Sequence, residues 1–210
     1  MTLRLDVPAL PGRVGQLAAA RPGARVMVGI VGPPGAGKST VAERLAAQIG
    51  RQARVLPMDG FHLAQRELDR LGRADRKGAP DTFDVDGYVS ALARVRADTP
   101  GTVYAPAFER SIEEPIACAL PFGPDVRVVL TEGNYLLHDA GGWEQVRPLL
   151  DECWYLDVDD AVRVRRLVDR HVRYGRPEAA ARAWVDQVDE RNTALVARGR
   201  ARADALVALD

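Results

Sequence analysis

The sequence is poor in cysteine and has no long apolar run. Its 210 residues include two cysteines, Cys118 and Cys153, without the spacing of a metal site, so neither a disulfide framework nor a zinc centre is expected. No apolar run approaches the roughly 20 residues that a membrane-spanning helix needs. The start of the chain lacks the charged, apolar and cleavage regions of a signal peptide. We therefore expect a cytoplasmic protein with free thiols.

Neither sign of charge is in excess, and lysine is scarce. The 29 basic and 29 acidic residues cancel, which gives no support for a nucleic acid or an anionic membrane as a partner. Among the basic residues only Lys38 and Lys77 are lysines, and arginine supplies the rest. These two lysines mark candidate positions for a compact ammonium group, with chance as the alternative for Lys77.

What the sequence does contain is a glycine-rich run directly after the apolar stretch 26–31. The run fits the pattern GxxxxGK[ST] and comprises Gly32, Pro33, Pro34, Gly35, Ala36, Gly37, Lys38, Ser39 and Thr40. Such a loop turns backbone N–H groups around a phosphate at the N-terminus of the next helix. Lys38 would reach the β and γ phosphates of a bound nucleotide, and the Ser39 hydroxyl would bind Mg²⁺. The alternative is a glycine-rich turn that binds nothing, which the flanking strand and amphipathic helix disfavour.

Apolar runs alternate with helical patterns, which predicts an α/β fold with a parallel sheet covered by helices on both faces. The predicted strands are 26–31, 54–58, 102–104, 126–131, 154–158 and 204–209, and the predicted helices are 5–20, 38–49, 62–71, 87–97, 160–174 and 178–196. Asp86 is the expected N-cap of helix 87–97. We expect one domain over residues 1–210, with a helix and linker in 1–25 and a Pro-rich substrate-side insertion within 99–124.

Two carboxylates stand directly after predicted strands. Asp59 follows strand 54–58 and Glu132 follows strand 126–131, and ligands of open α/β sheets bind beyond the carboxyl ends of strands. Asp59 is a candidate base that accepts the proton of a hydroxyl group, with an ordinary Asp-Gly turn as the alternative. Glu132 is a candidate ligand of Mg²⁺ or a second acid/base group, with a solvent-exposed strand terminus as the alternative.

The predicted helix 160–174 carries a stripe of arginines. Their spacings of 3, 4 and 3 residues place them on one face, and valines occupy another face. The arginines are Arg163, Arg166, Arg170 and Arg173, and the valines are Val164, Val168 and Val172. Guanidinium groups suit phosphate oxygens, so beside a phosphate loop this helix is expected to be a mobile lid. In isolation the stripe would indicate only a solvated basic face.

In combination these features resemble the uridine kinase, pantothenate kinase and phosphoribulokinase group. The segments that carry the resemblance occur in the order of that group over about residues 26–209: GPPGAGKST (32–40), MDGFHL (58–63), RKGAPDTFD (76–84), YAPAFER (104–110) and EGNYLL (132–137). Two of them are most similar to bacterial pantothenate kinases and their sugar- or nucleoside-kinase-like relatives. The resemblance implies a P-loop kinase domain, a three-layer sandwich with an acceptor-side segment over about 72–124 and an arginine-rich lid over about 160–177.

The resemblance also implies ATP-dependent, Mg²⁺-assisted phosphorylation of a hydroxyl group on a small metabolite. It makes Asp59 the catalytic base and Glu132 a magnesium-associated carboxylate beside Ser39, with Lys38 and Arg166 as further catalytic groups. The residues expected at the acceptor are His62, Arg76, Lys77, Asp81, Phe83, Tyr104, Phe108, Arg110 and Asn134. The residues expected at ATP, besides the loop, are Arg170, Arg173 and Asn192, with 200–209 flanking the adenine.

The sequence leaves the acceptor open. Ala105 and Pro106 stand where the resemblance to pantothenate kinases would require a histidine, and FER replaces the usual uridine kinase pattern. Nucleosides, sugars and pantothenate-like alcohols therefore all remain candidate acceptors. A nucleotide-dependent regulatory ATPase without a small acceptor is the alternative function, whereas a guanine-reading Asn-Lys-x-Asp motif does not occur. A homodimer is an open alternative for the oligomeric state.

Overall fold

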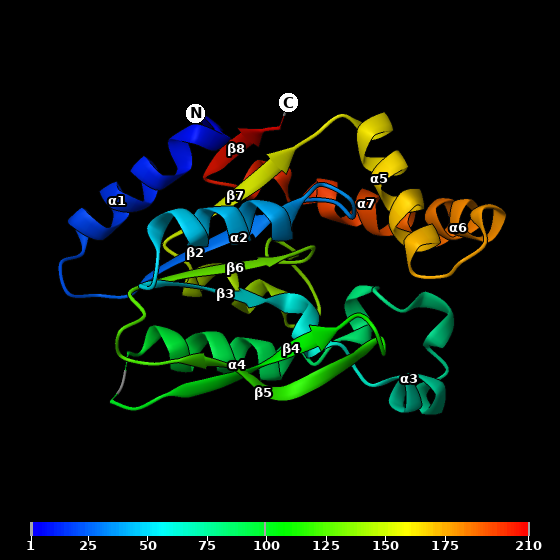
Figure 1. Cartoon of the computed structure of the whole chain (residues 1–210), viewed down its shortest axis with the longest axis horizontal. Helices are drawn as coiled ribbons and strands as arrows, with labels where there is room; N and C mark the ends of the chain where they lie inside the picture. Colours follow the sequence, from blue (N-terminus) through cyan, green and yellow to red (C-terminus); the bar gives the residue numbers. More distant parts are fainter. Residues whose placement is uncertain (1, 99, 210) are drawn as a thin grey trace.

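A six-stranded parallel sheet forms the centre of the protein (Figure 1). The computed structural model describes residues 2–98 and 100–209, and the strand order is β1-β8-β7-β2-β6-β3. Each strand is parallel to its neighbours. The strands are β1 (Leu3–Asp6), β2 (Val26–Val31), β3 (Ala53–Pro57), β6 (Val128–Gly133), β7 (Glu152–Asp157) and β8 (Ala205–Ala208). The predicted parallel α/β fold is confirmed.

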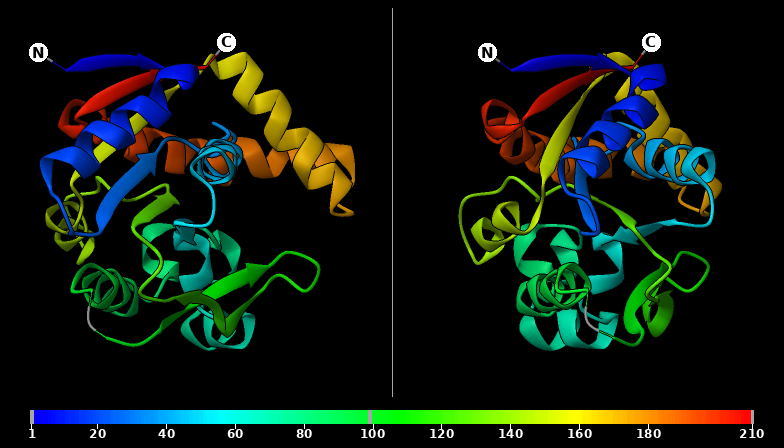
Figure 2. Two further views of the ribbon diagram at one scale, coloured as in Figure 1. Left: turned by 60° about the vertical axis from the view of Figure 1, so that its left-hand side comes forward. Right: turned by 90° about the vertical axis from the view of Figure 1, so that its left-hand side faces the viewer.

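Helices cover both faces of this sheet (Figure 2). The helices are α1 (Leu10–Ala20), α2 (Lys38–Ile49), α3 (Gln65–Leu71), α4 (Val85–Arg96), α5 (Asp160–Arg173), α6 (Glu178–Trp184) and α7 (Glu190–Arg198). Among them, α1 and α2 pack on one face of the sheet and α4 and α7 on the other. In the central strand β2, Val28 packs with α1 and α2, whereas its neighbour Met27 packs with α4 and α7. This alternation explains why β2 is apolar throughout and buried on both faces. Within the described residues, no helix has the length and apolar character needed to cross a membrane.

The N-terminal segment differs from the predicted helix 5–20. Leu3–Asp6 form the edge strand β1, paired with β8, and the helix starts only at Leu10. The apolar side chains of Leu3 and Leu5 alternate with polar ones, which is the pattern of a strand rather than a helix. A parallel partner from the other end of the chain makes this short strand possible.

Two further helix predictions need correction. Asp84, not Asp86, caps α4, because its carboxylate accepts a hydrogen bond from Gly87 N at 2.9 Å. The helix predicted over 178–196 is interrupted between α6 and α7 by a π-helical turn, Val185–Asp189. Apolar periodicity predicts neither the carboxylate hydrogen bond of Asp84 nor the π-helical turn.

The Pro-rich segment after α4 forms a β-hairpin instead of one short strand. β4 (Val103–Glu109) pairs antiparallel with β5 (Glu114–Phe122), apart from the main sheet. Buried side chains of both strands, among them Val103 and Phe122, join the core under α4. The hairpin therefore forms an additional layer over that core, next to the turn that follows β3. Residue 99, at the start of the predicted insertion, lies outside the described residues.

Arg25 is a buried arginine that ties the start of β2 to α4 and to the end of the hairpin. The residue is 4% exposed, and its guanidinium donates hydrogen bonds to the carbonyl oxygens of Val95, Gly123 and Val126. We expect Arg25→Met to lower the free energy of unfolding by about 3 kcal/mol, because three carbonyl groups lose their donor. Urea denaturation measures the change. The exposed control Arg44→Met is expected to change it by less than about 0.5 kcal/mol, and equal losses in both variants would contradict the prediction.

Candidate active site

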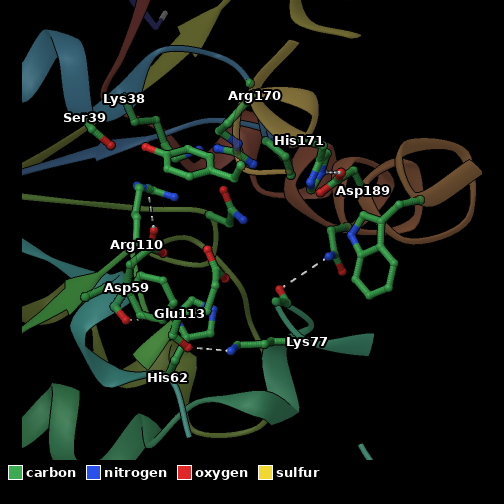
Figure 3. A pocket seen from close by; sticks show the side chains of 18 of the residues that line it. Lys38, Ser39, Asp59, His62, Lys77, Arg110, Glu113, Arg170, His171 and Asp189 are labelled. Atoms are coloured by element: carbon green, nitrogen blue, oxygen red, sulfur yellow. Dashed lines mark hydrogen bonds and ion pairs between the residues drawn. The ribbon is translucent and has the colours of Figure 1, made fainter. Parts of the chain in front are cut away.

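A cavity of about 720 Å³ lies at the carboxyl ends of β2, β3 and β6. Lys38 reaches it from the loop after β2, Asp59 from the turn after β3, and Glu132 from the end of β6. Helix α5 and the segment that follows it form the facing wall. Figure 3 shows labelled side chains of the loop after β2, the turn after β3 and α5 directed into one space. Parallel strands bring their carboxyl ends to one edge of the sheet, which is why three distant segments meet here.

The glycine-rich loop presents unpaired backbone donors to this cavity. α2 begins at Lys38, so the N–H groups of Lys38, Ser39 and Thr40 have no acceptor within the helix, and all three residues line the cavity. Gly35 has φ +80°, and a Cβ there would lie 2.7 Å from the carbonyl oxygen of Arg163. Only glycine therefore fits where the loop touches α5. A helix N-terminus with free donors is a suitable site for a phosphate group.

The Lys38 side chain lies within the loop. Its Nζ donates hydrogen bonds to the carbonyl oxygens of Gly32, at 2.9 Å, and Pro33, at 3.1 Å. Burial lowers the pKa of Lys38 to about 8, and the negative charges of Glu132 and Asp59 oppose that shift. The ammonium group has lost hydration that these contacts only partly replace. An incoming anion would therefore stabilise its charged form.

Ser39 and Glu132 form a pair that suits a divalent cation. Ser39 Oγ donates a hydrogen bond to Glu132 Oε1 at 3.1 Å, and Glu132 is 5% exposed. Burial, together with the charge of Asp59, raises the pKa of Glu132 to about 7. A hydroxyl and a carboxylate side by side are the hard oxygen donors that Mg²⁺ prefers, and a cation would favour the ionised carboxylate. These residues fit Mg²⁺ if phosphate oxygens and water supply the other ligands.

Asp59 lies on a 3₁₀ turn, Met58–Phe61, that follows β3 directly. His62 closes the turn by donating its backbone N–H to the Asp59 carbonyl at 3.2 Å, and its Nδ1 lies 2.8 Å from the same oxygen. Burial lowers the pKa of His62, so this ring is neutral at pH 7. The Asp59 carboxylate instead faces Arg110 of the hairpin, with Nη2 3.4 Å from Oδ2. It is held near a cation and stays open to the cavity, as a base requires.

Gly60 allows the hairpin to approach this turn. A Cβ at position 60 would lie 2.4 Å from the carbonyl oxygen of Pro106. We expect Gly60→Ala to push β4 away, to separate Arg110 from Asp59, and to lower the free energy of unfolding by about 2 kcal/mol. The control is Gly15→Ala, where a Cβ meets nothing within 4 Å. Thermal and urea unfolding report the difference, and equal stability of the two variants would refute the close packing.

Aromatic rings and the second lysine form the wall beside Asp59. The ring of His62 packs against Phe83 and Phe108, with centroid distances of 4.0 and 4.9 Å. Lys77 Nζ donates to the carbonyl oxygen of Glu113 at 2.7 Å and lies 5.6 Å from the Phe108 ring centre. Lys77 thus fixes the tip of the hairpin while lining the cavity.

The arginines of α5 do not share one environment. Arg166 and Arg170 line the cavity. Arg163 is 1% exposed and pairs with Glu190 at 2.7 Å, so it anchors α5 to α7. Arg173 lies in a separate surface groove between α5 and α6, because three residues turn a helix by about 300° and place it about 60° around from Arg170. The expected contact of Arg173 with ATP does not fit this geometry.

Most residues expected from the sequence meet in the cavity, and the exceptions have local reasons. Those that line it are Pro34, Gly35, Gly37, Lys38, Ser39, Thr40, Asp59, His62, Lys77, Phe83, Phe108, Arg110, Glu132, Asn134, Arg166, Arg170 and Asn192. Those outside its lining are Gly32, Pro33, Ala36, Arg76, Asp81, Tyr104 and Arg173. Arg76 pairs with Asp81 at 2.9 Å on the surface. Tyr104 is 53% exposed because it alternates with buried neighbours along β4.

Several cavity residues do not follow from the sequence, and Asn192 lies in another part of the site than the sequence predicts. Asn192, expected at ATP, places its Nδ2 3.4 Å from the carbonyl oxygen of Gly78 in the acceptor-side segment. The lining residues that the sequence did not suggest include Gln65, Glu113, His171, Tyr174, Arg176, Trp184 and Asp189. Of these, His171, Tyr174 and Arg176 belong to the end of the predicted lid, and the polar sequence there could have indicated them. Trp184, at the end of α6, and Asp189, at the end of the π-helical turn, belong to no motif.

A phosphate loop lies between a central strand of this sheet and α2, and an arginine-bearing helix lies over that loop. Together these features define a P-loop kinase. The chain belongs to the phosphoribulokinase/uridine kinase family, whose sequence model matches residues 27–208. The predicted family is thereby confirmed. Membership implies ATP binding, usually with Mg²⁺.

Individual relatives agree with this assignment. The chain is 34% identical over 163 residues to C227.14 of Schizosaccharomyces pombe, a candidate uridine kinase, which covers 72% of this chain and 68% of the relative. The crystal structure of a candidate fructose transport system kinase from Silicibacter sp. TM1040 superposes with a TM-score of 0.87, 37% identity and coverage of 96% and 98%. YFH7 of Saccharomyces cerevisiae has a TM-score of 0.85, with coverage of 98% and 99%, but its 20% identity shows only the shared fold.

Proposed function

We propose that the protein transfers the γ-phosphoryl group of ATP, bound with Mg²⁺, to a hydroxyl group of a small metabolite. The observation that carries the proposal is that the phosphate loop, the Ser39–Glu132 pair and Asp59 all line one cavity of about 720 Å³. Small-molecule sites measure about 300–1,000 Å³, and the volume of this cavity falls within that range. A nucleoside or a sugar is a candidate acceptor, in keeping with the names of the relatives described above at 34% and 37% identity.

The donor side of the site binds phosphate oxygens. The free N–H groups at the start of α2 and the ammonium group of Lys38 hold the phosphates, and Arg166 and Arg170 face the same space from α5. Mg²⁺, held through Ser39 and Glu132, would neutralise the charge that develops on the transferred group. Positioning and charge stabilisation are the main requirements of phosphoryl transfer.

The acceptor side of the site activates the hydroxyl group. The Asp59 carboxylate accepts the hydroxyl proton as the oxygen attacks the γ phosphorus, and Arg110 holds that carboxylate in place. The neutral His62 and its aromatic neighbours limit the access of water to this point. The carboxylate of Asp59, which accepts the proton, and the groups that bind the ATP phosphates thus face one another across the cavity.

An acceptor screen tests the proposal. The purified protein is incubated with ATP, Mg²⁺ and one of D-fructose, D-ribose, uridine, pantothenate or glycerol, and ADP release is followed with a coupled assay. We expect at least one acceptor to stimulate ADP release and to yield a phosphate ester visible by ³¹P NMR. Tight ATP binding without stimulation by any acceptor would instead favour a regulatory ATPase.

A further inference from the structure

The cavity wall formed by the end of α5, the π-helical turn and α7 carries a buried polar pair. His171 Nε2 lies 3.0 Å from Asp189 Oδ2, and the two side chains are 18% and 10% exposed. Figure 3 shows this pair across the cavity from Asp59 and His62. The pair therefore faces the acceptor space from the side away from the proposed base.

The π-helical turn Val185–Asp189 is what brings Asp189 to this wall. A π turn inserts one extra residue into a helix and so rotates the side chains that follow it; such turns are rare and often occur at functional sites. Asp189 is 7% exposed, whereas Asp186 in the same turn is exposed. One carboxylate of this turn is thus buried at the cavity while the other is solvated. Simple α-helical periodicity would not produce this placement.

The wall presents two side-chain oxygen atoms that can still accept hydrogen bonds. Asn192 is 5% exposed, and its Nδ2 faces the carbonyl oxygen of Gly78, which also accepts the Tyr135 hydroxyl at 2.6 Å. Because that oxygen can only accept, the amide is oriented with its nitrogen toward Gly78 and its Oδ1 elsewhere. Within residues 2–98 and 100–209, Asn192 Oδ1 and Asp189 Oδ1 receive no hydrogen bond. A ligand that satisfies both atoms must bring O–H or N–H donors.

The charge of the cavity lining bears on whether the donor group can be cationic. Lys77, Arg170 and Arg176 line the same cavity, and Arg176 stacks on the Trp184 ring at 4.2 Å. The carboxylates of Asp59, Glu113, Glu132 and Asp189 line the cavity too, but six lysine and arginine side chains outnumber them, so the lining as a whole disfavours an ammonium group. Uncharged hydroxyl groups can donate to the two free oxygens without that penalty.

We propose that Asp189 and Asn192 bind hydroxyl groups of the acceptor, which is therefore a neutral polyhydroxy compound, of the sugar type, with at least two hydroxyl groups besides the one that is phosphorylated. The inference rests on the proposed function and names the acceptor class of that same site. His171 orients the Asp189 carboxylate by donating to Oδ2. Asp189 determines affinity for the acceptor and takes no part in the proton transfer at Asp59.

Kinetics of Asp189→Asn test the inference. For the polyhydroxy acceptor that wild-type protein uses best, we expect KM to rise by about tenfold or more, kcat to stay within about threefold, and KM for ATP to be unchanged. Asp186→Asn, the same substitution in the same turn, is the matched control and leaves all three constants unchanged. Asn192→Ala, which removes the second free oxygen, gives an independent rise in KM if Asp189→Asn does not fold, as judged by thermal unfolding.

Deoxy analogues of the same acceptor identify the hydroxyl group involved. The analogue that lacks the hydroxyl bound by Asp189 is expected to show the same KM with wild-type protein and with Asp189→Asn. Unchanged acceptor KM in both Asp189→Asn and Asn192→Ala, or a best acceptor with a single hydroxyl group or an ammonium group, would overturn the inference while leaving the kinase activity established. Absence of turnover by the wild-type protein with every acceptor would overturn the proposed function itself.

Discussion

Asp59→Asn is expected to lower kcat for phosphotransfer by about 10³-fold while KM for ATP stays within about twofold. The carboxamide has nearly the same size and can still hydrogen-bond to an acceptor hydroxyl, but it cannot take up the proton. Asp59 faces Arg110 at 3.4 Å on the acceptor side of the cavity. The loss should therefore fall on the chemical step rather than on nucleotide binding.

The matched control for this variant is Asp75→Asn. Asp75 is an exposed aspartate outside the cavity lining, so its substitution should leave kcat within about twofold. Nucleotide affinity of both variants is measured by equilibrium titration with ADP and Mg²⁺. Acceptor-dependent ADP release at the wild-type rate in Asp59→Asn would remove Asp59 as the base.

The parts of the site that could be predicted lie where a motif coincides with the end of a strand. The apolar runs before Lys38, Asp59 and Glu132 predict buried parallel strands, and the geometry of such a sheet then places all three residues at one edge. Contacts between distant segments do not enter this prediction. The phosphate loop, the candidate base and the candidate metal carboxylate therefore follow from local pattern.

The parts that could not be predicted depend on contacts between distant segments. Arg163 and Arg166 are three residues apart on one helix, yet the first is buried because α7 supplies Glu190 and the second lines the cavity. β1 exists because β8, at the other end of the chain, pairs with it. Asp189 reaches the wall of the cavity through a π-helical turn. Helical spacing alone contains none of this information.

Lys38→Met is expected to lower kcat/KM for ATP by about 10³-fold, because the substitution removes the cation that holds the β and γ phosphates. The methionine side chain has a similar length, so the loop keeps its volume. Steady-state kinetics measure the loss, and titration with ADP shows weakened nucleotide binding as well. Wild-type affinity for ADP in this variant would contradict the role of Lys38 at the phosphates.

The same variant should be more stable than the wild type when no nucleotide is bound. Burial lowers the pKa of Lys38 from 10.5 to about 8, so the folded protein binds this proton less tightly than the unfolded chain does. The charged lysine therefore costs stability at every pH below about 8, and the cost disappears as the pH rises to about 10.5, where the unfolded chain also loses the proton. Thermal unfolding should give Lys38→Met the higher melting temperature at pH 7, with an advantage that shrinks between pH 8 and 10.5. A melting temperature below that of the wild type at pH 7 would show that the hydrogen bonds from Lys38 to the loop carbonyls outweigh the lost hydration. If the expected result is obtained, the charged Lys38 destabilises the nucleotide-free protein, and only phosphate binding offsets this loss of stability.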